Sequence, residues 1–66
     1  MFNVNSPDGF STYHVFDDDR HVADIYYEPD QRKPWKGYIG KHEVFSCRSY
    51  NEVLARLAKY FHVEEQ

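Results

Sequence analysis

Carboxylates are the most numerous side chains in this sequence that could take part in chemistry, and most lie in its first half. Asp24 and Glu28 are an even number of positions apart, so on a strand they would lie on the same face. Every second residue of a strand recurs after roughly 6.6–6.8 Å. This repeat is close to the spacing of phosphates along a nucleic-acid strand. The predicted partner-binding residues are six acids, whose carboxylates would take the place of phosphates, and one tyrosine, which would supply a stacking contact. They are Asp17, Asp18, Asp19, Asp24, Glu28 and Asp30, with Tyr26. The alternative is that these acids only solubilise the surface and form a polar turn.

The charges are divided along the chain. Residues 1–31 contain seven acids and one base, a balance of −6, whereas residues 32–63 contain seven bases and two acids, a balance of +5. A net charge of −3 therefore conceals two opposed blocks. Such asymmetry is typical of a protein with a charged partner.

The basic block offers a second kind of binding, directly to nucleic acid. Bases next to aromatic side chains can combine phosphate contacts with stacking. The candidates are Arg32, Lys33, Lys36 and Lys41 around Trp35 and Tyr38. The sequence pI of about 5.7 favours the acidic interpretation over this one.

Metal binding and catalysis receive less support from residue spacing. His14 and His21 flank the turn formed by residues 17–19, but structural zinc sites prefer closely spaced cysteine pairs, and the sequence has one cysteine. Cys47 has no base at a motif spacing, and no serine lies in a nucleophile elbow. We therefore predict no metal, no cofactor and no enzymatic activity.

The length and cysteine content limit the class of protein. A chain of 66 residues forms one domain, and a domain of this size buries only about 60% of the surface that its unfolded chain exposes. A single cysteine excludes a disulfide within the monomer and favours a reducing compartment. The sequence shows no secretory leader and no long apolar run, so we expect a monomeric cytoplasmic protein.

Strand patterns occupy most of the chain before residue 47. Alternating β-branched and aromatic residues predict strands at about 10–16, 21–28 and 35–46, with a short edge strand at 2–5. Within the second of these strands, Ala23, Ile25 and Tyr27 are predicted to face the core, and Val22 and Asp24 the other side. Gly40 either marks a bulge in one long third strand, which we favour, or turns the chain into a fourth.

A helix at about 50–62 closes the sequence. Ser49 and Glu52 form a capping box, and apolar residues then recur every three or four positions. The stripe comprises Tyr50, Val53, Leu54, Leu57, Tyr60 and Phe61. We predict a single α+β domain, residues 1–66, in which an antiparallel β-meander of three to four strands packs on this helix.

Two resemblances bear on function. In size, acidity and lack of motifs the chain resembles small phage-encoded anti-CRISPR proteins that mimic nucleic acid. This resemblance implies an inhibitor that docks on a Lys/Arg-lined nucleic-acid groove of a protein such as a CRISPR effector complex. In topology alone, residues 10–62 are similar to the DNA-binding domains of phage integrase arms and plant AP2 factors, which implies direct DNA binding. A structural accessory subunit is a third alternative.

Overall fold

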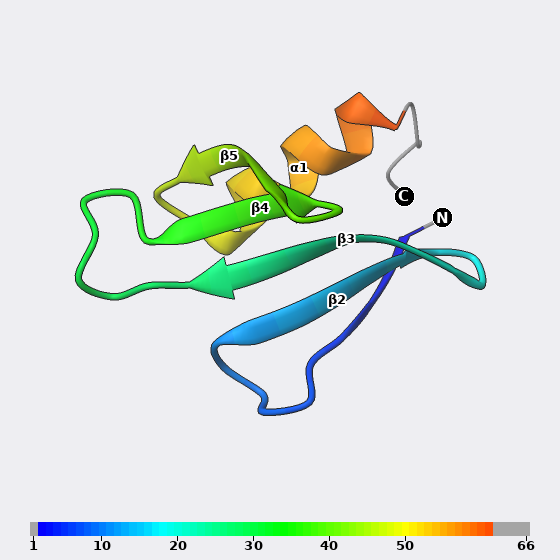
Figure 1. Ribbon diagram of the computed structural model, residues 1–66, viewed down its shortest axis with the longest axis horizontal. Helices are drawn as coiled ribbons and strands as arrows, with labels where there is room; N and C mark the ends of the chain where they lie inside the picture. Colours follow the sequence, from blue (N-terminus) through cyan, green and yellow to red (C-terminus); the bar gives the residue numbers. More distant parts are fainter. Residues whose placement is uncertain (1, 62–66) are drawn as a thin grey trace.

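The computed structural model describes residues 2–61, which form an antiparallel sheet and one helix on its surface (Figure 1). The strands follow one another in the sheet in their order along the chain, so the sheet is a meander. The elements are β1 (Phe2–Asn5), β2 (Thr12–Asp17), β3 (Arg20–Tyr27), β4 (Trp35–Ile39), β5 (His42–Cys47) and α1 (Tyr50–Tyr60). The predicted α+β class and the C-terminal helix are confirmed.

The sheet has five strands rather than the predicted three to four, because the chain reverses at Gly40. Ile39 pairs with His42, so Gly40 and Lys41 form a two-residue hairpin loop. Gly40 has a φ of 67°, the left-handed conformation that such a loop needs at a central position. The preferred expectation of one bulged strand over 35–46 was therefore wrong.

The loop before β2 is longer than the sequence pattern indicated. The carboxylate of Asp8 accepts hydrogen bonds from the backbone N–H groups of Phe10, Ser11 and Thr12. These bonds hold the chain in a loop up to residue 11, and β2 begins at Thr12. Phe10, predicted as the first residue of this strand, lies in the loop with 68% of its surface exposed.

One extra residue interrupts the pairing of β2 with β3. Val15 pairs with Ala23 and Phe16 pairs with His21, which leaves Val22 as a bulge on β3. A bulge breaks the alternation of side chains, so Val22 packs against the core beside Ala23. The prediction for Ala23 and Ile25 is confirmed, because both are buried, but the prediction that Val22 faces outward was wrong.

The helix begins as its sequence predicts. The side chain of Ser49 accepts a hydrogen bond from the backbone N–H of Glu52. Val53, Leu57 and Ala58 are buried, and α1 lies against β4 and β5 (Figure 1). Tyr60, predicted as part of the apolar stripe, is instead exposed.

The helix ends at Tyr60, and the predicted end at residue 62 lies outside the described residues. None of the helical structure within residues 2–61 combines the length and the apolar character required to cross a membrane.

Aromatic rings extend the core beyond its aliphatic centre. Trp35 contacts the rings of Tyr13, Tyr27 and Tyr50, at centroid distances of 5.8, 4.7 and 5.6 Å. These rings link β2, β3 and β4 to the first turn of α1. Such pairs add roughly 0.5–1.5 kcal/mol each beyond the area that they bury.

Candidate functional site

The face of the sheet turned away from α1, here called the outer face, carries polar and aromatic side chains on adjacent strands. Within residues 2–61, no other helix covers this face. Strand alternation and cross-strand pairing place on it Thr12, His14, Asp24, Tyr26, Lys36, Tyr38, Glu43 and Ser46.

A tyrosine pair lies at the centre of the outer face. The rings of Tyr26 and Tyr38 meet edge to face, with 5.2 Å between their centroids. The hydroxyl of Tyr38 donates a long hydrogen bond of 3.5 Å to Oε1 of Glu43. Loss of hydration, together with the negative charges of Glu43 and Glu28, raises the pKa of Tyr38 above 10. The pair is therefore bordered by carboxylates.

The predicted acidic residues are divided among three places. Asp17, Asp18 and Asp19 lie at the turn between β2 and β3, whereas Asp30 lies in the loop beyond the opposite end of β3. Asp18 has a φ of 57°, a conformation that aspartate tolerates better than most residues, so the turn itself accounts for an acid there. The structure therefore keeps this turn and Asp30 apart, along the length of β3.

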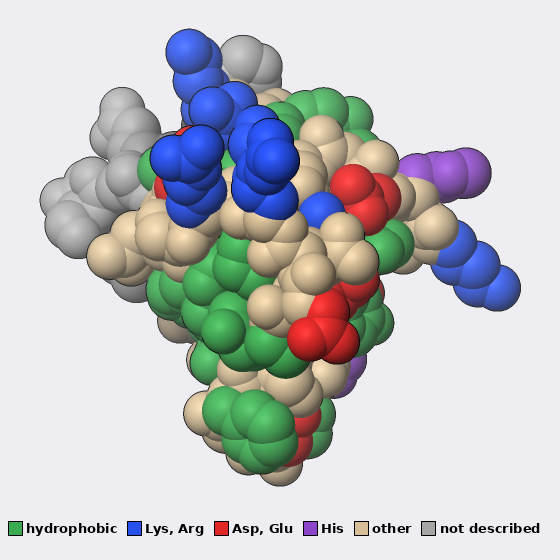
Figure 2. Space-filling view, turned by 90° about the vertical axis from the view of Figure 1, so that its left-hand side faces the viewer, with side chains coloured by type: hydrophobic (Ala, Val, Ile, Leu, Met, Phe, Trp, Pro, Cys, Tyr) green, Lys and Arg blue, Asp and Glu red, His purple; other side chains and the backbone are tan. Residues whose placement is uncertain are grey.

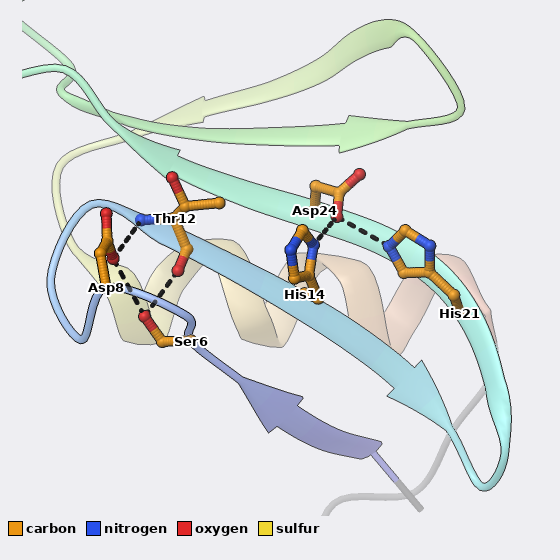
Figure 3. Close-up of polar contacts among 6 residues, drawn as sticks. All are labelled: Ser6, Asp8, Thr12, His14, His21 and Asp24. Atoms are coloured by element: carbon orange, nitrogen blue, oxygen red, sulfur yellow. Dashed lines mark hydrogen bonds and ion pairs between the residues drawn. The ribbon is translucent and has the colours of Figure 1, made fainter.

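Asp24, the central residue of the predicted acidic row, is only 14% exposed and is held by two histidines (Figure 3). Its Oδ1 accepts a hydrogen bond from Nδ1 of His14 and another from Nε2 of His21, both at 2.7 Å. A carboxylate engaged in this way is less available to a partner than an exposed one. The sequence placed the histidines beside the Asp17–Asp19 turn and gave no sign that they contact Asp24.

The outer face also carries Lys36, which is only 9% exposed. Its ammonium donates a hydrogen bond to the hydroxyl of Ser46 on β5. Trp35, the predicted stacking platform of the basic block, packs in the aromatic part of the core. Lys41 lies at the β4–β5 turn. Lys36, Trp35 and Lys41 therefore lie in three different environments.

A different basic cluster forms where the β3–β4 loop meets the start of α1. Lys33, Arg48 and Arg56 line an open hollow of about 460 Å³. Ser46, Cys47 and Glu52 complete its lining. Figure 2 shows Lys and Arg side chains gathered at the upper edge of this end of the molecule.

The hollow contains a negative group as well. Arg56 donates a hydrogen bond to Glu52 at 3.4 Å, so one of the three cations is already engaged.

Burial raises the pKa of the Cys47 thiol, and the nearby charge of Glu52 raises it further, so the protonated thiol is favoured. Arg48 and Arg56 were not among the predicted binding residues, because they are far from Lys33 in sequence.

Comparison with known proteins adds no family assignment. No protein-family model matches the chain, and no match was found among curated proteins or solved structures.

Proposed function

We propose that this protein is a small non-catalytic binding protein whose outer face docks on a positively charged surface of another protein. It acts as an inhibitor by occupying a groove that otherwise holds nucleic acid, in the manner of the anti-CRISPR proteins that it resembles in size and acidity. The observation that supports this proposal is the Tyr26–Tyr38 pair, bordered by Glu28 and Glu43 on the face opposite α1.

The chemistry of this surface fits a protein interface. Tyrosine combines a large rigid ring with a polar hydroxyl, and it is enriched among the residues that dominate binding energy. Carboxylates around such an anchor steer the approach of a basic partner and reject an acidic one. Glu28 and Glu43 take the role first assigned to Asp24, since the histidines already occupy that carboxylate.

The test is retention of nucleic-acid-binding proteins from a nuclease-treated cell extract on the immobilised protein. We expect retained proteins to be released by added DNA or RNA, because both ligands would compete for one groove. Glu43→Lys and Tyr38→Ser should abolish this retention. Asn51→Lys adds a positive charge at an exposed position of α1, away from the outer face, and should leave retention intact.

Two outcomes contradict the proposal. One is retention that is equal for the wild type and Glu43→Lys. The other is retained protein that added nucleic acid does not release.

Direct binding of nucleic acid is the second candidate function, and the hollow lined by Lys33, Arg48 and Arg56 favours it. Cations that contact phosphates displace counterions, so this binding should weaken steeply as salt rises. A gel shift of single-stranded and duplex DNA and RNA at low salt tests this function. Arg48→Ala should reduce the shift, whereas Lys41→Ala at the β4–β5 turn should preserve it. Absence of any shift at low salt eliminates this candidate.

A further inference from the structure

Three side chains from two adjacent strands bring potential metal ligands together on the outer face (Figure 3). The ligand atoms of His14 on β2 and of His21 and Asp24 on β3 all lie within 4.8 Å of one another. His14 and Asp24 are direct cross-strand partners, which places their side chains next to each other. This geometry does not depend on any part of the proposed docking function.

The bulge at Val22 places the third side chain. In a regular strand, His21 would share the face of Ala23 and Ile25, which are buried in the core. The extra residue reverses this alternation, so that His21 pairs with Phe16 and turns toward Asp24. Bulges often re-aim a side chain near a functional site.

Ring contacts hold the two imidazoles in place. His21 packs against the ring of Phe16, with 5.3 Å between centroids. The rings of His14 and His21 meet edge to face at 5.4 Å. Both imidazoles therefore direct one nitrogen to the same oxygen of Asp24. A metal ion that replaces the protons of these two hydrogen bonds finds the two nitrogens and the carboxylate already close together.

We propose that His14 Nδ1, His21 Nε2 and the Asp24 carboxylate form a binding site for a divalent transition-metal ion, with zinc as the expected ion. Two imidazoles and one carboxylate are a donor set that zinc binds, with a water molecule in the fourth position. Zinc–ligand bonds of about 2.0–2.2 Å place tetrahedral donor atoms about 3.3–3.6 Å apart. The two N···O separations are now 2.7 Å, and all the ligand atoms lie within 4.8 Å of one another, so the side chains must adjust to admit the ion. Each imidazole moves its proton to the ring nitrogen that faces away from the metal.

The experiment is titration of the purified metal-free protein with Zn²⁺ in a calorimeter, and with Co²⁺ followed by visible absorption. The wild type should bind one equivalent of each ion, and Co²⁺ should develop the intense bands of four-coordinate geometry. Zinc should also raise the melting temperature, because it binds the folded protein preferentially. Removal of a residue that only hydrogen-bonds to a metal ligand typically weakens metal binding roughly 10- to 100-fold. Removal of a direct ligand should weaken zinc binding by more than this.

Two variants remove ligands, and one serves as a matched control. His21→Ala and Asp24→Asn should each lose high-affinity binding, and the asparagine variant preserves the shape of the side chain if the alanine variant does not fold. His42→Ala removes an exposed histidine at the start of β5 and should bind zinc as the wild type does. Circular dichroism of each variant verifies the fold before titration.

The proposal is overturned if the wild type binds no zinc at millimolar concentration. It is also overturned if folded His21→Ala or Asp24→Asn binds zinc as tightly as the wild type does. Because the titration uses this protein alone, its failure would not affect the docking proposal. Loss of docking would likewise leave the metal site standing.

Discussion

Lys36 and Ser46 face each other across β4 and β5 on the outer face, and Nζ of Lys36 donates a hydrogen bond of 2.7 Å to the hydroxyl of Ser46. Lys36 as a whole is only 9% exposed, so most of its side chain packs against the sheet. The contact ties a residue that the sequence suggested for phosphate binding into the packing of the sheet.

The Lys36–Ser46 contact should contribute measurably to stability. Ser46→Ala removes the acceptor and should lower the free energy of unfolding by about 1–3 kcal/mol, because a buried donor is left without its partner. Adding Lys36→Met to that variant should restore most of the loss, since both polar groups are then absent. Urea unfolding measures both variants, and Ser46→Thr, which retains the hydroxyl, is the control. If Ser46→Ala had the same free energy of unfolding as the wild type, this account would be contradicted.

Gly37 on β4 allows close approach of the helix. A Cβ atom at this position would lie 3.0 Å from Cγ1 of Val53 and 3.4 Å from Cδ2 of Phe45. Gly37→Ala should therefore destabilise the protein by about 1–3 kcal/mol through overpacking. In a double-mutant cycle with Val53→Ala, the cost of Gly37→Ala should fall, because the second change removes the atom in contact. Equal costs in the two backgrounds would show that the helix does not lie this close.

Asp8 should make stability depend on acid pH. The hydroxyl of Ser11 donates a hydrogen bond to the carboxylate of Asp8. This bond, together with one from the backbone N–H of Phe10, holds the pKa of Asp8 far below its ordinary value of 3.8. The unfolded chain therefore takes up a proton near that value while the folded chain remains ionised. The contribution is complete above about pH 5 and decreases as the pH falls toward the folded pKa.

Asp8→Asn should remove this part of the acid dependence. Its free energy of unfolding, measured in urea at a series of pH values below 5, should decrease less steeply than that of the wild type. Asp30→Asn changes an exposed acid in the β3–β4 loop and should preserve the wild-type slope. Parallel slopes for Asp8→Asn and the wild type would refute the role of this carboxylate.

Cys47 should react slowly while the protein is folded. The residue is 2% exposed, and burial raises the pKa of its thiol, so both access and the thiolate fraction are reduced. Iodoacetamide should label the native protein much more slowly than the urea-unfolded protein at the same pH. Labelling at equal rates would show that the end of β5 opens readily.

Local patterns in the sequence determined the elements that depend on neighbouring residues. The short strand at 2–5 and the start of the helix at Tyr50 were predicted correctly. The Ser49 cap and the apolar spacing of Val53 and Leu57 act within a few residues, so they can be read without knowledge of the fold. The α+β class followed from the same patterns.

The composition of each surface was decided only by the tertiary structure. Strand side chains alternate with a period of two, so the extra residue at Val22 was enough to move His21 to the face of Asp24. The aromatic contacts that place Trp35 in the core, and the pairing that encloses Lys36, join residues far apart in sequence. The sequence by itself determined which acids, bases and histidines are present. Cross-strand pairing determined which of them meet, because register is a non-local property.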